Sequence, residues 1–156
     1  MVTNETLIKE LADHYGRDRS SLLPILHGVA DKNNYLTEDD LTVVARELHL
    51  SGAQVFGTAT FYSFLNLVPR GKYVIRICKT ISCDMKNKDA IVNHIEDMLK
   101  IKVGETTEDK KFTLLYTNCM GWCDKGPSML INDTPYSDLT PEKVHVIIKQ
   151  FMDKAE

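Results

Sequence analysis

Long apolar runs are absent from this sequence of 156 residues. No stretch approaches the roughly 18 to 20 consecutive apolar residues that a membrane-spanning helix needs, so we expect no membrane span. The first ten residues have neither the apolar core of a signal peptide nor the Arg-rich, acid-poor composition of a transit peptide. We therefore expect a cytoplasmic protein.

Strong charge of one sign is also lacking, since 19 Lys and Arg residues stand against 22 Asp and Glu residues, for a net charge of −3. Because the composition gives the chain no excess of basic residues, we do not expect nucleic acid as a partner. The sequence contains no GxGxxG motif, no Walker A motif and no Ser/His/Asp pattern. We expect the chain itself to have no nucleotide site and no catalytic residue.

Cysteine is scarce, and its placement is not random. The four cysteines form two pairs, Cys78 and Cys83 with C-x4-C spacing and Cys119 and Cys123 with C-x3-C spacing, about 35 residues apart. Disulfides are rare in the cytoplasm, which favours metal binding. Four thiolates at one point suit a soft metal centre.

The first part of the chain, residues 1–66, contains no cysteine and has the apolar periodicity of four short helices. Gly16 is a plausible end for the first helix. Ser20 and Ser21 are candidate caps for the second, Thr37 for the third, and Ser51 begins a capping box of S-x-x-Q form. We expect a helical N-terminal domain over 1–66.

The pattern changes near Pro69 and Gly71, and residues 72–156 alternate strands with helices. Strands are expected at 72–78, 112–117 and 128–131, with a hairpin turn at 132–133, and helices at 90–100 and from Pro141 to Phe151. Residues after Cys83 are expected to form a polar loop. The predicted fold class is α/β: an N-terminal helical bundle followed by a small layered α/β domain.

Each cysteine pair follows the end of a predicted strand. If the strands 72–78 and 112–117 are neighbours in one sheet, both loops leave the same edge and four sulfurs can converge. The spacings are wider than the C-x2-C of most zinc ribbons and redox sites, which favours a [2Fe–2S] cluster held by Cys78, Cys83, Cys119 and Cys123. A structural zinc site, disulfides and separate buried thiols remain alternatives.

Residues beside the cysteines are expected to donate hydrogen bonds to the cluster. Gly121 lets the backbone pass close to inorganic sulfide, where its N–H groups can donate. Thr80 and Ser82 are expected to add hydroxyl donors from the first loop.

The cysteine spacing, Cys119-Met-Gly-Trp-Cys123 and a following proline resemble the thioredoxin-like [2Fe–2S] ferredoxin family. The segments 55–63, 102–107, 132–136 and 139–143 are similar to the family as well, so the resemblance covers nearly the whole chain. It implies a thioredoxin-like fold for 72–156 and one [2Fe–2S] cluster on the four cysteines.

Members of this family are small subunits of NADH:quinone oxidoreductase (complex I), of NAD(P)-linked hydrogenases and of NAD-dependent formate dehydrogenases. The resemblance implies an electron-transfer subunit beside the FMN of a partner flavoprotein that binds NAD(P), with an Fe–S-rich hydrogenase or dehydrogenase subunit as a further partner. FMN and other clusters are expected only in partner chains. An electron-bifurcating [FeFe] hydrogenase is the expected parent enzyme, and complex I or an NAD-dependent formate dehydrogenase is the alternative. A structural zinc-binding assembly module is the alternative from a different class of function.

Two further features bear on partners. The segment 56–64 has apolar residues on several helical faces, which predicts either bundle core or docking onto the flavoprotein. Five lysines near the cysteine loops and the polar loop at 104–111 are expected to be solvated rather than to form a docking patch. They are Lys79, Lys86, Lys88, Lys110 and Lys111.

Overall fold

The structure, a computed structural model, describes residues 4–154 and divides the chain into two compact units, Met1–Arg70 and Gly71–Glu156. The ends of the two predicted domains, residues 1–3 and 155–156, lie outside the described part. Among the described residues, no helix is long and apolar enough to cross a membrane.

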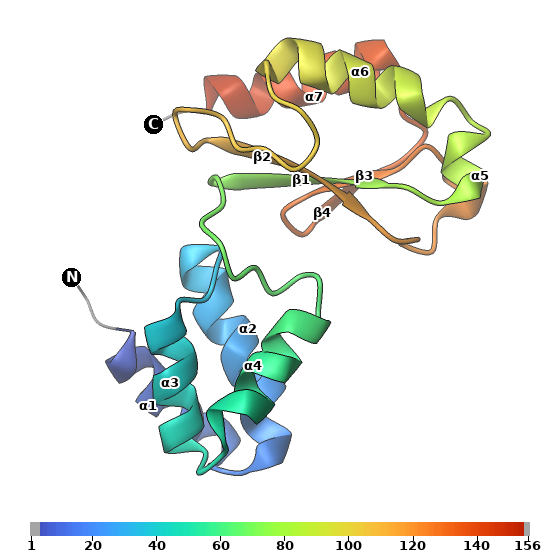
Figure 1. Ribbon diagram of the computed structural model, residues 1–156. Helices are drawn as coiled ribbons and strands as arrows, with labels where there is room; N and C mark the ends of the chain where they lie inside the picture. Colours follow the sequence, from blue (N-terminus) through green and yellow to red (C-terminus); the bar gives the residue numbers. More distant parts are fainter. Residues whose placement is uncertain (1–3, 155–156) are drawn as a thin grey trace. The chain divides into compact units, whose positions relative to one another are not determined.

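The first unit is a bundle of helices (Figure 1). Its elements are α1 (Glu5–Tyr15), the 3₁₀ turn η1 (Arg19–Ser21), α2 (Leu22–Asn33), α3 (Glu38–Glu47) and α4 (Gly52–Phe61). One residue from each helix shows how they share a single core: Ile8, Ile25, Val44 and Val55 are all fully buried. Burying a side chain of this size stabilises the fold by about 1.5–3 kcal/mol, so the four apolar stripes hold the bundle together.

Local capping chemistry sets most of the helix boundaries in this unit. Thr37 with Asp40 and Ser51 with Gln54 form reciprocal capping boxes at the starts of α3 and α4. Gly16 ends α1 with a φ of 102° and donates its N–H to Ala12. These three predictions are confirmed.

The predicted serine cap of α2 is wrong. The Ser21 hydroxyl donates to the carbonyl oxygen of Tyr15 at 2.7 Å, and its side chain caps no helix. Asp18 caps η1 instead, accepting from the backbone N–H of Ser20 at 2.7 Å. The serine hydroxyl therefore ties the α1–α2 connection together.

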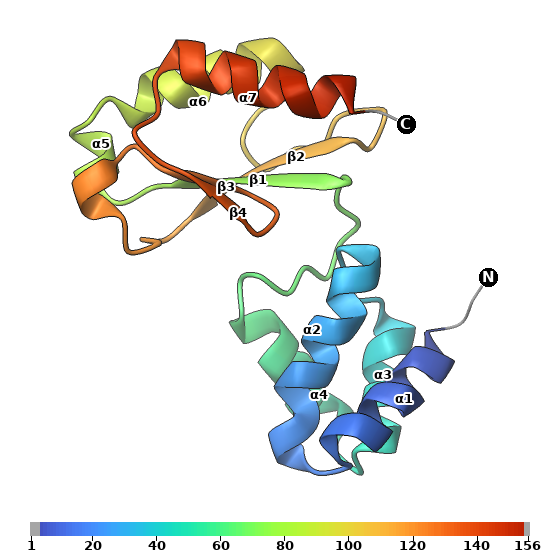
Figure 2. The same cartoon turned by 180° about the vertical axis from the view of Figure 1, so that it is seen from behind.

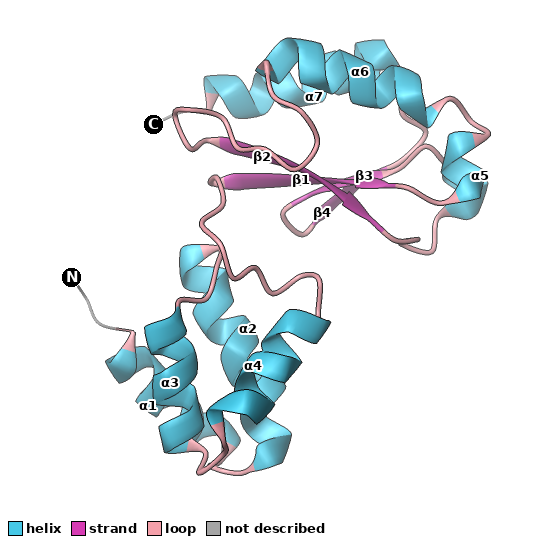
Figure 3. Cartoon of the chain, in the orientation of Figure 1, coloured by secondary structure: helices cyan, strands magenta, loops and turns pink. Residues whose placement is uncertain are grey.

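The second unit is a four-stranded sheet with helices packed on it (Figure 3). Its strands are β1 (Tyr73–Cys78), β2 (Phe112–Thr117), β3 (Met129–Ile131) and β4 (Thr134–Tyr136), in the order β2-β1-β3-β4. β1 and β2 are parallel, whereas β3 pairs antiparallel with both β1 and β4. The predicted strands and hairpin are present, and this unit is α/β as expected.

Two helices cover one face of this sheet. Views from both sides show α6 (Lys88–Leu99) and α7 (Pro141–Asp153) side by side over the strands (Figure 2). Their apolar stripes bury Ile95 and Ile148 against Ile75 and Leu114 of the central strands. The parallel β1–α6–β2 unit brings the carboxyl ends of β1 and β2 to one edge of the sheet.

Candidate metal centre

Both cysteine pairs lie at that edge because the strands before them are neighbours. In the parallel register Cys78 stands opposite Thr117, and the backbone N–H of Lys79 donates to the carbonyl oxygen of Thr117 at 2.9 Å. Cys119 follows two residues after Thr117. The two strands are neighbours, which is the condition for the four sulfurs to converge, and their loops leave the sheet together.

The first cysteine loop is not the plain loop that the sequence suggested. Ile81–Asp84 form a one-turn helix, α5, so that Cys83 lies on a helical turn rather than in extended chain. Thr80 precedes this turn, yet its hydroxyl lies 3.0 Å from the sulfur of Cys78 and does not cap the turn. Four residues are too few to show helical periodicity, so the sequence pattern gives no sign of this turn.

Cys78 and Cys83 are both about 1% exposed, and each has a hydroxyl beside its sulfur. Burial raises the pKa of the Cys78 thiol, but hydrogen bonds from Thr80 and its other neighbours outweigh burial and leave this pKa below its ordinary value. Burial, together with the Cys78 sulfur, raises the pKa of Cys83. The Ser128 hydroxyl lies 3.8 Å from the Cys83 sulfur.

Cys119 and Cys123 are exposed, and their sulfurs are 3.1 Å apart. The Cys119 sulfur raises the pKa of Cys123, first through the hydrogen bond between the two groups and second because two thiolates this close repel one another. A hydrogen bond from the Ser82 hydroxyl acts in the opposite sense. Thr80 and Ser82, the two hydroxyl donors predicted from the first loop, therefore each contact a different cysteine pair.

Gly121 shapes the second loop. Its φ of 90° lies in the left-handed region that residues with a side chain rarely adopt, and its N–H donates to the Cys119 sulfur at 3.4 Å. Trp122, next in the chain, is 38% exposed. The glycine therefore turns backbone N–H groups toward sulfur.

The two pairs face one another across the sheet edge. The sulfur of Cys78 accepts a hydrogen bond from the backbone of Met120, in the other loop, and Cys123 interacts electrostatically with Cys78. Within the described chain, no three His, Cys, Asp or Glu side chains form a group suited to one metal ion. The arrangement is two pairs of thiols.

Sequence reasoning missed three contributors to this site. Ser128 reaches Cys83 from the start of β3, and a Cβ added to Gly126 would lie 3.1 Å from the Cys83 sulfur, so glycine avoids a tight contact with that sulfur. Lys86 is exposed as expected, and its ammonium also donates to backbone carbonyls of the second loop. All three depend on contacts across more than 35 residues, which local patterns do not show.

The prediction that the lysines near the cysteine loops are solvated is wrong at Lys88. Lys88 is buried, and its ammonium pairs with Asp84 at 2.8 Å and with Asp89 at 3.4 Å. It also lies over the Tyr116 ring, 5.6 Å from the centroid. Lys88 therefore fixes α5 to the start of α6, behind the cysteines.

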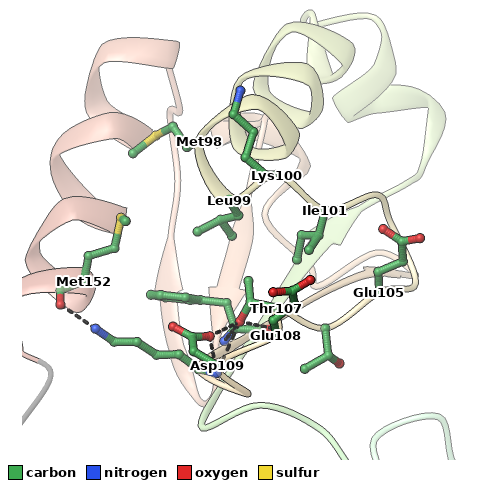
Figure 4. A pocket seen from close by; sticks show the side chains of 12 residues that line it. Met98, Leu99, Lys100, Ile101, Glu105, Thr107, Glu108, Asp109 and Met152 are labelled. Atoms are coloured by element: carbon green, nitrogen blue, oxygen red, sulfur yellow. Dashed lines mark hydrogen bonds between the residues drawn. The ribbon is translucent and has the colours of Figure 1, made fainter.

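An open cavity of about 940 Å³ lies at the opposite end of the sheet, where β2 begins (Figure 4). Apolar side chains of Met98, Ile101 and Phe112 line it, with Glu105 and Asp109 among its charged residues. It contains no thiol and no histidine. The residues suited to redox or metal chemistry are therefore those at the other end.

A model of the thioredoxin-like [2Fe–2S] ferredoxins matches residues 8–152 of the chain. The chain belongs to this family. The resemblance noted in the sequence is thus confirmed, and so is the thioredoxin-like fold of the second unit.

Relatives of known assembly are similar along nearly their whole length. The NADH-quinone oxidoreductase E subunit of Buchnera aphidicola subsp. Acyrthosiphon pisum is 36% identical over 152 residues, 96% of this chain and 94% of the relative. The corresponding E subunit of Escherichia coli K12 is 35% identical over 138 residues, 88% of this chain and 83% of the relative.

Solved structures of an NAD⁺-reducing [NiFe]-hydrogenase share the fold. The H₂-reduced form superimposes with a TM-score of 0.77 at 24% identity, over 90% of this chain. The air-oxidized form gives a TM-score of 0.75 over 86% of this chain. This chain spans only 23% of those hydrogenase chains.

The cofactor in the name of this family, a [2Fe–2S] cluster, fits the residues present. Such clusters bind four thiolates, two on each iron, and the cysteines stand as two pairs. Glycine at 126 keeps space beside Cys83, and hydroxyl and amide donors already lie at the sulfurs. The donor set and its surroundings therefore suit this cofactor.

Proposed function

We propose that this chain is the [2Fe–2S] electron-transfer subunit of a multi-subunit oxidoreductase that uses NAD(H). The observation that carries the proposal is the convergence of the two cysteine pairs at the carboxyl ends of the parallel strands β1 and β2. A bound [2Fe–2S] cluster supplies storage and transfer of single electrons. The relatives that match over nearly their full length are subunits of NADH-quinone oxidoreductase.

In this proposal Cys78 and Cys83 hold one iron, and Cys119 and Cys123 hold the other. The surrounding groups moderate the charge on the four thiolates, because hydrogen bonds to sulfur disperse negative charge. Thr80 acts on Cys78, and the Gly121 N–H acts on Cys119.

The two pairs differ in access. Cys78 and Cys83 are enclosed by the sheet edge and by Ser128, whereas Cys119 and Cys123 are exposed. The protein therefore excludes water on the first side and leaves the second open. We propose that the redox partner approaches on the side of Cys119 and Cys123.

The proposed partner is a flavoprotein subunit that carries FMN and binds NAD(P), with an Fe–S-rich subunit completing the complex. The helical unit offers a surface for such a partner, because it exposes large apolar side chains between residues 56 and 68. These side chains, here called the exposed apolar segment, are Phe56, Phe61, Tyr62, Phe64 and Val68. Within the predicted segment 56–64, the interpretation as bundle core holds for Ala59, which is buried.

The parent enzyme is the finer part of the proposal. The family resemblance leads to an electron-bifurcating [FeFe] hydrogenase, whereas the relatives named above favour a quinone-reducing enzyme of the complex I type. A formate dehydrogenase uses the same kind of subunit.

Purification of the tagged chain from the cells that produce it tests these assignments. We expect a complex that contains FMN and oxidises NADH or NADPH. Assays with hydrogen and ferredoxin, with quinone and with formate identify the parent enzyme. Recovery of the chain alone, or with partners that bind no flavin, would contradict the proposed function.

A further inference from the structure

Lys86 connects the two cysteine loops directly. It follows α5, in the first loop, and its backbone N–H donates to the carbonyl oxygen of Cys83 at 3.2 Å. Its ammonium donates to two carbonyl oxygens of the second loop, that of Cys123 at 3.1 Å and that of Asp124 at 2.7 Å. One side chain thus joins segments that are 37 and 38 residues apart.

The stem of the lysine is held as well as its end. A Cβ built on Gly126 would lie 3.5 Å from Cδ of Lys86, so the stem passes along the backbone at Gly126. Two charge-assisted hydrogen bonds then fix the ammonium. These contacts place the exposed Lys86 side chain against the second loop.

The second loop has few other ties near Cys123. Its own turn is closed by the Lys125 N–H, which donates to Trp122 at 3.1 Å, and the N–H of Asp138 donates to Lys125 at 2.7 Å. Neither bond reaches the first loop. The Ser82 hydroxyl of the first loop bonds to the Cys123 side chain. Among the described residues, Lys86 adds the side-chain hydrogen bonds from the first loop to the backbone at Cys123 and Asp124.

We propose that Lys86 is a positioning residue for the metal centre, with two effects. It clamps the loop that carries Cys119 and Cys123 onto the loop that carries Cys83, and it fixes a positive charge beside Cys123. The inference rests on the proposed function, because it takes these cysteines as ligands. The reduced cluster carries one more negative charge than the oxidised cluster, and a nearby cation favours the reduced state. Lys86 therefore raises the reduction potential of the centre.

Four single variants separate the two effects. Lys86→Met removes the charge and both hydrogen bonds, Lys86→Gln keeps a donor without the charge, and Lys86→Arg keeps both. Lys125→Met is the matched control, because it removes a lysine of the same loop whose ammonium has no hydrogen bond or ion pair among the described residues.

The readouts are the midpoint potential of the reconstituted [2Fe–2S] centre and the protease sensitivity of residues 118–126 in the cluster-free protein. We expect Lys86→Met to lower the potential and to speed cleavage. Lys86→Arg should have the potential and the cleavage rate of the wild type. Lys86→Gln should return the cleavage rate closer to the wild-type value than it returns the potential. Lys125→Met should leave the cleavage rate unchanged and shift the potential less than Lys86→Met does. If Lys86→Met keeps its circular dichroism but no longer retains the centre, the clamp is supported as well.

A Lys86→Met protein with the potential and the cleavage rate of Lys125→Met overturns the inference. Should Lys86→Met not fold, the same comparison with Lys86→Gln decides. A wild-type chain that takes up no iron refutes the proposed function instead, and the cleavage assay on cluster-free protein still tests the clamp.

Discussion

At the scale of single residues, the four thiols have unequal surroundings. Cys78 and Cys83 are buried beside hydroxyl groups, and Cys119 and Cys123 are exposed and close to one another. A buried ligand can be replaced only with disturbance of the sheet edge. An exposed ligand can be replaced with little effect on the fold, so it gives the cleaner test.

Cys119→Ser should remove most of the visible absorbance of the reconstituted protein, because a serine hydroxyl is a much poorer iron ligand than a thiolate. The helical content of Met1–Arg70 should remain, since Cys119 lies in the other compact unit. Absorbance and circular dichroism measure both effects. Met120→Leu, which keeps volume in the same loop, is the control.

An unchanged chromophore in Cys119→Ser would remove this residue from the ligand set. Loss of the helical signal together with the chromophore would contradict the independence of the two units.

Residue types and spacing were enough to predict the cysteine pairs, Gly121 and the hydroxyls of Thr80 and Ser82, because these lie within or beside the motifs. Lys86 and Ser128 were not predictable in this way. Their roles arise when α5 and the start of β3 meet the second loop, and that meeting depends on the whole sheet. Long-range contacts of flexible side chains leave no local signature.

At the scale of elements, two glycines inside helices provide a matched pair. Gly57 of α4 is exposed, and an added Cβ would meet nothing within 4 Å. Gly28 of α2 faces α1, where the same Cβ would lie 2.8 Å from a methyl group of Leu11.

We expect Gly57→Ala to stabilise the helical unit by about 0.5–1 kcal/mol, because alanine loses less conformational freedom in a helix. Gly28→Ala should be less stable than Gly57→Ala by about 1 kcal/mol or more, because Leu11 must move. Chemical denaturation followed by circular dichroism gives both free energies of unfolding. Equal effects of the two substitutions would show that α1 and α2 do not approach closely at Gly28.

Glu96 connects α6 to the loop that follows it. Its carboxylate accepts hydrogen bonds from the Lys102 ammonium at 2.6 Å and from the Val103 N–H at 3.1 Å. The Lys102 bond, helped by Val103, holds the pKa of Glu96 below its ordinary value of 4.5. A carboxyl whose pKa is lowered by folding stabilises the protein at any pH above the ordinary pKa of that carboxyl. The stabilisation is lost as the pH falls through the pKa that the carboxyl has in the folded protein.

Glu96→Gln should therefore lower stability slightly at pH 7 and flatten the loss of stability between about pH 5 and pH 3. Thermal denaturation over this range, followed by the fluorescence of Trp122, reports on the second unit. Glu108→Gln is the control, because its carboxylate has no hydrogen bond or ion pair among the described residues. Parallel pH profiles for wild type and Glu96→Gln would refute this role.

Helix boundaries were predictable where neighbouring residues alone form the cap. They were not predictable where a tertiary hydrogen bond competes with the local capping preference. The capping boxes at Thr37 and Ser51 and the Pro141 start of α7 follow from neighbouring residues alone. Ser21 has the chemistry of a cap, but its hydroxyl bonds to the carbonyl oxygen of Tyr15 in the preceding helix. Tertiary contact outweighed local preference there.

At the scale of the whole molecule, assembly is the main question. Phe61 ends α4 and is 79% exposed, so its side chain contributes little to the bundle core. Exposed apolar groups of this size are typical of protein interaction sites. The exposed apolar segment is therefore where a substitution can separate assembly from folding.

Phe61→Asp should leave the fold and the metal centre unchanged and should abolish or strongly reduce recovery of the flavoprotein in a pull-down. A charge placed in an apolar interface costs several kcal/mol when it is left unpaired. Tyr15→Asp, at an exposed aromatic residue of α1, is the matched control and should retain the partner. Retention of the flavoprotein by Phe61→Asp would exclude this segment as the contact.

All the assignments above depend on one [2Fe–2S] cluster, which we propose is held by Cys78, Cys83, Cys119 and Cys123. Metal and acid-labile sulfide analysis of anaerobically purified protein, combined with low-temperature EPR before and after reduction, tests it most directly. We expect a brown protein with about two iron and two sulfide atoms per chain and an EPR signal that appears only on reduction. A colourless protein with one zinc ion and no iron would show a structural zinc module and contradict it.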